Sequence, residues 1–117
     1  MFDPAQEREL IDEAAAYLRQ NSEMTPRIAI VLGSGLGPLA KKVDKARGVL
    51  NRDIPGFHET SVVGHQGRLV FGYLSDVPVV VIQGRIHYYE GYSQVDIVRP
   101  LRVCHELGVR DLLVTNA

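Results

Sequence analysis

Residues 33–37, Gly-Ser-Gly-Leu-Gly, form a glycine-rich turn that suits a phosphate group. The turn follows an apolar run and precedes Pro38, which can open a helix. Backbone amides in such a turn can point together at an anion, and glycine lets the anion approach closely. The Ser34 hydroxyl adds a side-chain donor. The turn alone also fits a strand-to-helix connection without a ligand, so it needs support from other segments.

Residues 83–92 carry a second and denser set of chemically useful side chains. Arg85 and His87 are two residues apart, so both can face the same way in an extended loop. A guanidinium and an imidazole are suitable partners for an oxyanion, and Tyr89 offers a ring and a hydroxyl on the same side. Glu90 could instead hold Arg85 in place. Because the segment follows the strongest apolar run, it predicts a ligand site at the end of a strand.

The remaining histidines and the cysteine give weaker signals. His65 lies between Gly64 and Gly67, where the backbone can approach a ligand, although a histidine in a turn is the simpler interpretation. His58 and His105 are interpreted as packing or surface residues. The four histidines have no metal-motif spacing, so no metal site is predicted. Cys104 is expected to be a buried apolar residue.

Two other phosphate loops fit residues 33–37 poorly. A P-loop requires Gly-Lys-Ser/Thr, which is absent, and a dinucleotide loop requires glycine where Pro38 stands. Asp53 lies at the spacing of a ribose partner, 20 residues after Gly33, but within an Asn-Arg-Asp-Ile-Pro turn. An enzyme with a nucleotide cofactor therefore remains a weaker hypothesis.

Alternating helices and strands must position these segments. Apolar periodicity predicts helices near 4–20, 38–43 and 94–107, and strands at 27–32, 48–53, 62–63, 68–74, 77–83 and 111–114. Asp3 and Ser93 are expected to cap the first and third helices, and Pro100 to kink the third. The predicted fold class is α/β, with a mixed, mostly parallel sheet flanked by helices.

Length and composition describe one globular domain. The chain has 117 residues, of which 45% are hydrophobic and 23% charged, and one cysteine, so an internal disulfide is excluded. A net charge of −1 argues against a general nucleic-acid binder. No apolar run reaches the ~18 residues of a membrane span, and the start carries no signal-peptide pattern. The apolar run 111–114 predicts a buried central strand, so we expect further chain after Ala117 and an incomplete fold.

Five motifs in this order resemble the trimeric purine nucleoside phosphorylases. The resemblance covers about residues 28–117 and corresponds to roughly the first two-fifths of that family. It implies that residues 1–117 are the N-terminal part of a single α/β phosphorylase domain. The motifs that carry it are Gly33-Ser34-Gly35-Leu36-Gly37, Ile54-Pro55-Gly56-Phe57, Gly64-His65-x-Gly67-Arg68-Leu69, Gln83-Gly84-Arg85-x-His87-x-Tyr89-Glu90-Gly91-Tyr92 and Val114-Thr115-Asn116-Ala117.

The resemblance implies reversible phosphorolysis of purine (deoxy)nucleosides to a free purine and (deoxy)ribose 1-phosphate. Phosphate is the co-substrate, and no metal or other cofactor is implied. A cytoplasmic homotrimer is implied, acting in purine salvage on small molecules, without nucleic-acid or membrane partners. Tyr89 is expected to contact the sugar side of the nucleoside. The groups implied to bind phosphate are Ser34, His65, Arg85, His87 and the backbone amide of Ala117.

The resemblance assigns no catalytic residue in this portion. In the family an Asn and a Glu serve the base, a further His serves the sugar hydroxyl and another Ser serves phosphate, all after the matched part. Two alternatives therefore stay open. The chain could be an inactive phosphate-binding or interaction module, or part of an enzyme similar to methylthioadenosine phosphorylase.

Overall fold

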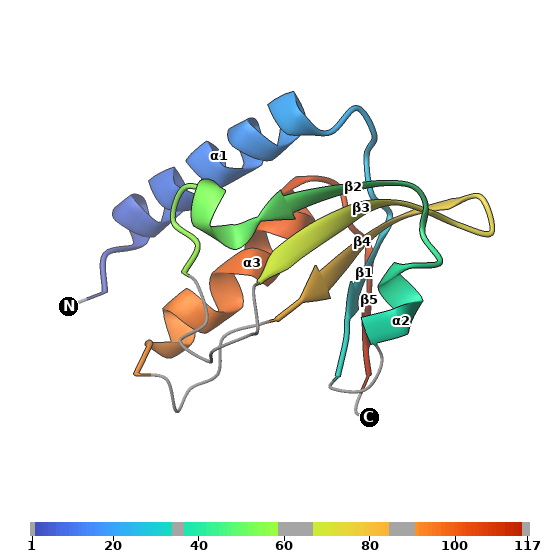
Figure 1. Ribbon diagram of the computed structural model, residues 1–117. Helices are drawn as coiled ribbons and strands as arrows, with labels where there is room; N and C mark the ends of the chain where they lie inside the picture. The colour runs from blue at the N-terminus through green and yellow to red at the C-terminus, as the bar shows by residue number, and fades with distance from the viewer. Residues whose placement is uncertain (1, 34–36, 59–66, 85–90, 116–117) are drawn as a thin grey trace.

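The computed structural model describes residues 2–33, 37–58, 67–84 and 91–115. Three α-helices, five strands and one 3-10 turn occur within these ranges (Figure 1). In chain order they are α1 (Pro4–Asn21), β1 (Ile28–Val31), α2 (Gly37–Ala40), β2 (Asp44–Leu50), η1 (Asn51–Asp53), β3 (Arg68–Leu74), β4 (Val77–Gln83), α3 (Gln94–Glu106) and β5 (Asp111–Val114).

The five strands form one mixed sheet in the order β2-β3-β4-β1-β5. The strand β1 pairs in parallel with both β4 and β5. The strand β3 is antiparallel to its neighbours β2 and β4. The predicted α/β class with a mixed sheet is confirmed.

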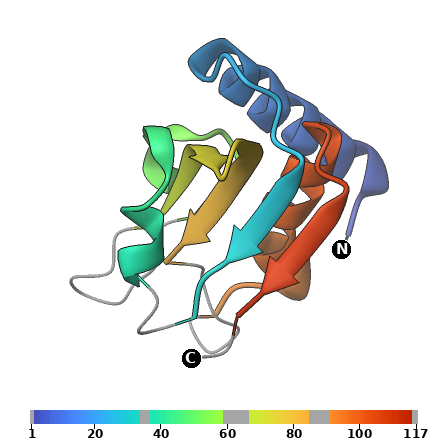
Figure 2. The same cartoon turned by 90° about the vertical axis from the view of Figure 1, so that its right-hand side faces the viewer.

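Side chains that alternate along the strands divide the core between the two faces of the sheet. Ala29 and Val31 join the cluster that includes Leu18 of α1 and Val103 of α3. Ile30, one residue away, joins a second cluster that includes Ala40 of α2. Two long helices therefore cover one face and the short α2 lies on the other (Figures 1 and 2). The core therefore holds β1 and β4 between these two layers.

The helix starts agree with the capping predictions. The Asp3 carboxylate accepts a hydrogen bond from the amide of Ala5 at 3.0 Å, and Pro4 occupies the first turn. The Ser93 hydroxyl accepts from the amide of Asp96 at 3.2 Å. The helix α3 continues through Pro100 to Glu106.

Two predicted elements are corrected. The strand expected at 48–53 is β2, which begins at Asp44 and ends at Leu50, because its residues pair with β3 over that range. The helix expected at 38–43 is the single turn 37–40. The strand expected at 62–63 lies outside the described residues.

The strand β5 is also corrected, from a buried central strand to an edge strand of the described sheet. Leu112, Leu113 and Val114 are 50%, 53% and 48% exposed. The reason is pairing: β5 lies beside β1, and no described strand lies on its other side. A fully apolar run predicts burial on both faces, but the strands and helices that surround a run decide its burial.

Candidate functional site

The parallel strands β1, β4 and β5 end at one edge of the sheet, and their arrowheads point the same way in Figure 2. Val31 in β1 is in register with Ile82 in β4 and with Val114 in β5. The antiparallel β3 begins at this same edge, where Arg68 pairs with Gln83. Ligands in open α/β sheets bind beyond the carboxyl ends of the strands, so this edge is the candidate site.

The predicted site residues belong to chain segments that meet this edge. The segments after β1, β4 and β5 leave the sheet here, and the segment before β3 enters it here. The predicted residues themselves, like Glu90, lie outside the described residues, so their roles stay predictions. They are Ser34, His65, Arg85, His87, Tyr89 and Ala117. The described residues at which these four segments join β1, β3, β4 and β5 all lie at one edge of the sheet.

Thr115 ties the ends of the first and last segments together. The Gly33 amide donates a hydrogen bond to Thr115 Oγ1 at 2.8 Å. The Thr115 hydroxyl and amide both donate to the carbonyl of Val31, at 2.9 and 3.0 Å. Sequence reasoning gave Thr115 no role of its own, although it belongs to the 114–117 motif. A hydroxyl directly after an apolar parallel strand was the available signal.

Gly67 brings the segment before β3 against the segment after β4. A Cβ atom at this position would overlap the Asn51 side-chain nitrogen and lie 2.9 Å from the Gly84 carbonyl oxygen. Only glycine fits this approach. The backbone amide of Asn51 donates a hydrogen bond to the Gly67 carbonyl at 3.0 Å, so η1 also contacts this edge. Asn51 is buried, and within the described ranges its Oδ1 atom has no hydrogen-bond partner.

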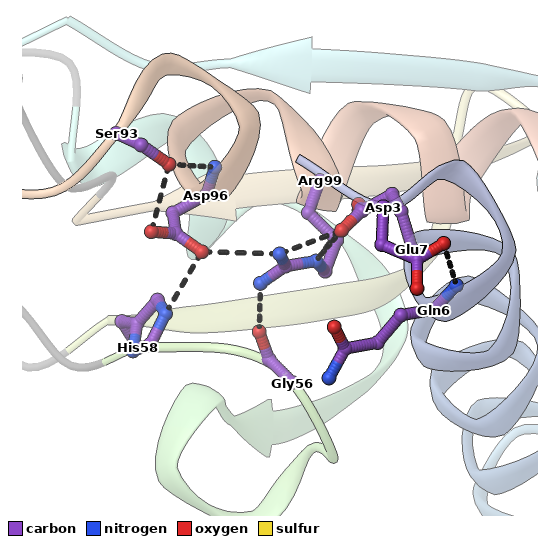
Figure 3. Close-up of polar contacts among 8 residues, drawn as sticks. All are labelled: Asp3, Gln6, Glu7, Gly56, His58, Ser93, Asp96 and Arg99. Atoms are coloured by element: carbon purple, nitrogen blue, oxygen red, sulfur yellow. Dashed lines mark hydrogen bonds and ion pairs between the residues drawn. The ribbon is translucent and has the colours of Figure 1, made fainter. Parts of the chain in front are cut away.

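A buried arginine supports the same region from the face covered by helices (Figure 3). Arg99 of α3 is 5% exposed and Glu7 of α1 is 5% exposed. Arg99 Nη2 donates to Glu7 Oε1 at 2.7 Å, and Nε donates to Glu7 Oε2 at 2.9 Å. Arg99 Nη1 donates to the Gly56 carbonyl at 2.7 Å. Hydrogen bonds to Glu7 raise the pKa of Arg99 despite its burial, so the guanidinium stays cationic.

Asp96 extends this cluster to His58. Asp96 Oδ1 lies 3.0 Å from Arg99 Nη2 and 3.3 Å from His58 Nε2. The His58 ring stacks on Tyr92, with centroids 4.5 Å apart. Burial raises the pKa of Asp96, but hydrogen bonds from Ser93, His58 and Arg99 lower it by more. The pKa of this carboxyl therefore lies below its usual value. The sequence gave no role to His58 or Arg99, because Asp96 lies far from His58 along the chain and Glu7 lies 92 residues from Arg99.

Two weaker sequence hypotheses are also answered. Asp53 is exposed after β2, and β3 and β4 separate that strand from β1. A ribose partner of the turn after β1 would lie beside β1, so the nucleotide-cofactor hypothesis is disfavoured.

Cys104 is buried as expected, and burial raises its pKa to about 12, so it is no activated thiol. The described ranges hold no cluster of three metal-ligating side chains.

The sequence from residue 27 to residue 117 matches the profile of the phosphorylase superfamily. This chain belongs to the phosphorylase superfamily. Its curated relatives include purine nucleoside phosphorylase 1 of Geobacillus stearothermophilus, which is 47% identical over 110 residues. That match covers 94% of this chain and 40% of the relative. The resemblance to the purine nucleoside phosphorylases is therefore confirmed.

Solved members of the superfamily share the fold. Purine nucleoside phosphorylase from Schistosoma mansoni in complex with inosine matches with a TM-score of 0.86 at 44% identity, covering 93% of this chain and 38% of that one. Isoform 2 from the same organism, in complex with cytosine and ribose 1-phosphate, matches with a TM-score of 0.87 at 44% identity, covering 92% and 38%. The chain thus spans about two-fifths of the length of these phosphorylases. In the part that the structure describes, no helix has the length and apolar character to span a membrane.

Proposed function

We propose that the whole protein carrying this chain is a purine nucleoside phosphorylase. It converts purine (deoxy)nucleosides and phosphate reversibly into a free purine and (deoxy)ribose 1-phosphate. The observation that supports this best is that the four segments containing the predicted phosphate ligands join their strands at one edge of the sheet. The relatives named purine nucleoside phosphorylase, and solved neighbours holding inosine or ribose 1-phosphate, support the substrate class.

The proposed phosphate site uses neutral and cationic donors. Tyr89 contacts the sugar, and the phosphate ligands are Ser34, His65, Arg85, His87 and the amide of Ala117. Hydroxyl, guanidinium and amide groups can desolvate phosphate without protonating it, so the anion keeps its charge. No resident metal or other cofactor is proposed.

The reaction replaces a carbon–nitrogen bond by a carbon–oxygen bond. The bond between the anomeric carbon and the purine nitrogen breaks, and its electron pair leaves on the purine, which takes up a proton. The sugar gains oxocarbenium character, which an adjacent phosphate anion stabilises before its oxygen forms the new bond. This chain contributes most of the phosphate side, and groups that recognise the purine belong to the rest of the protein.

We also propose that the protein works as a homotrimer in the cytoplasm, in purine salvage. The resemblance to trimeric family members supports the assembly. Sedimentation equilibrium of the whole protein tests it, with a mass three times that of one chain as the expected result. A monomer at micromolar concentration contradicts it.

A phosphorolysis assay tests the activity. The whole protein is mixed with inosine with and without phosphate, and hypoxanthine release is followed. Release that requires phosphate is expected. Arg85→Ala should raise the phosphate KM about tenfold to hundredfold, since one charged hydrogen bond contributes about 1.5–3 kcal/mol. Arg52→Ala, at an exposed arginine, is the matched control. Phosphate-dependent turnover with an unchanged KM in Arg85→Ala would exclude Arg85 as a ligand.

A phosphate-binding or interaction module without turnover is the second candidate, because the predicted ligands in this chain serve phosphate and the sugar and none serves the purine. The 117-residue chain assayed alone is expected to release no hypoxanthine. Normal turnover by that chain would contradict the claim that the remaining part is essential. Preference for methylthioadenosine over inosine in the whole protein would instead favour the related phosphorylase.

A further inference from the structure

The buried ion cluster of α1 and α3 reaches two segments at the candidate edge. We propose that Arg99, acting through Asp96 and His58, is a positioning residue for the phosphate site. The inference rests on the proposed function and deepens it, because it assigns a role to residues that do not touch phosphate. It concerns the described ends of the segments 59–66 and 85–90, at His58 and Tyr92.

Arg99 holds the chain just before the segment 59–66. Its Nη1 group donates to the Gly56 carbonyl at 2.7 Å, two residues before His58. Gly56 has φ of +80°, and its backbone lies against the Arg99 side chain. The positive φ turns the chain here, and the buried guanidinium fixes the direction in which it leaves.

Asp96 and His58 carry the same support to the segment 85–90. Asp96 accepts from both Arg99 and His58, and its second oxygen accepts from the Ser93 hydroxyl at 2.9 Å. His58 then stacks on Tyr92, two residues after the end of that segment. Arg99 therefore connects both segment ends to α1 and α3. Figure 3 shows this connection from Glu7 as far as His58.

Charge and burial explain why an arginine occupies this position. A guanidinium can donate in several directions within one plane, and here it serves Glu7, Asp96 and Gly56 at once. A lysine presents one compact ammonium and cannot bond all three in this geometry. The arrangement fixes backbone directions, so its loss should misplace phosphate ligands rather than remove one.

Kinetic constants of the whole protein test the proposal. Arg99→Met is expected to raise the phosphate KM about tenfold, because small misplacements of binding groups are costly. The KM for inosine should change less than twofold. His58→Ala removes only the contacts of His58 with Asp96 and Tyr92, at a half-exposed position. It should raise the phosphate KM about threefold. Arg99→Lys should fall between wild type and Arg99→Met.

Arg8→Met is the matched control, because Arg8 also connects α1 to α3 through Glu106 but is exposed. Its phosphate KM should equal that of wild type. If Arg99→Met does not fold, the paired variant Glu7→Gln/Arg99→Met, which leaves no buried unpaired charge, and His58→Ala give the answer. The proposal is overturned if folded variants keep the wild-type phosphate KM and lose only active protein or kcat.

The same experiment separates failure of this inference from failure of the proposed function. Wild-type protein without phosphate-dependent inosine cleavage refutes the function itself. Wild-type activity, a raised phosphate KM in Arg85→Ala and a normal one in the Arg99 and His58 variants refutes only the positioning role. Hydrogen exchange adds a second measurement. Peptides covering 56–66 and 85–92 should exchange faster in Arg99→Met than in Arg8→Met, and equal rates contradict the proposal.

Discussion

Two ion clusters connect α1 to α3, and they differ in burial rather than in chemistry. Arg99 meets Glu7 with both side chains 6% exposed. Arg8 meets Asp12 and Glu106 with side chains 51%, 59% and 37% exposed. The N–O distances overlap, at 2.6 and 3.0 Å for the Arg8 pairs and 2.7 and 3.0 Å for the Arg99 pairs. Distance alone therefore does not rank them. Water competes with the protein partners of the exposed Arg8. The Arg99 side chain is buried, so it depends on its protein partners for hydrogen bonds.

The difference matters for function because only the buried cluster touches the edge where the proposed site lies. It includes the Gly56 carbonyl and extends to His58, whereas the Arg8 cluster ends on the helix surface. Substitutions in the two clusters therefore compare a buried and an exposed connection between the same two helices.

The largest expected effect comes from Arg99→Met, which leaves Glu7 buried without a partner. We expect the free energy of unfolding to fall by about 3–5 kcal/mol. The paired variant Glu7→Gln/Arg99→Met should lose clearly less, because no unpaired charge remains. Urea denaturation of the whole protein measures both. A loss below about 1 kcal/mol in Arg99→Met contradicts the importance of burial.

Gly56→Ala should have the next largest effect. Its Cβ would meet Arg99 and Leu10 at 3.5 Å, an ordinary contact, so the cost is the positive φ. We expect a loss of about 1–2 kcal/mol in thermal or urea denaturation. Gly37→Ala is the control, since Gly37 is exposed and a Cβ there meets nothing within 4 Å. Equal losses in the two variants would show that Gly56 is under no constraint.

Acid should weaken the buried cluster through Asp96. Its folded pKa lies below the ordinary value of 3.8, so its contribution is present above that value and lost as pH falls through the folded pKa. The free energy of unfolding of the wild type should therefore fall below about pH 4. It should fall less steeply with pH in Asp96→Asn. Denaturation between pH 2.5 and 6 measures this, with Asp12→Asn of the exposed cluster for comparison. Identical slopes in wild type and Asp96→Asn contradict the assignment.

Arg8→Met should have the smallest effect. Hydrogen bonds to Asp12 and Glu106 raise the Arg8 pKa, but the side chain is exposed and the pairs are screened. We expect no resolvable change in urea denaturation at low or high salt. A loss comparable with that of Arg99→Met would remove the distinction between the clusters.

The sequence predicted the elements that local patterns control. The Asp3 and Ser93 caps, the apolar run of β4 and the helical period of α3 follow from neighbouring residues, and the structure has each of them. The start of β2 at Asp44 could not be predicted in this way, because pairing with β3 sets it. The place of β5 in the sheet depends on which strands lie beside it, and an apolar run does not predict its neighbours.

The candidate edge was predicted in part for the same reason. Polar residues after strands indicated it, since such residues meet at the carboxyl edge of a parallel sheet. Its support was missed, because Arg99 and Glu7 are 92 residues apart and lie on helices that the sequence alone does not bring together. Thr115 was missed because its partner Gly33 is 82 residues away.

A crystal structure of the whole protein with ribose 1-phosphate tests the central claim most directly. The account predicts that the phosphate group lies beyond the carboxyl ends of β1, β4 and β5, contacted by Ser34, Arg85 and His87. A phosphate bound away from this edge, with those three side chains turned from it, would contradict the account.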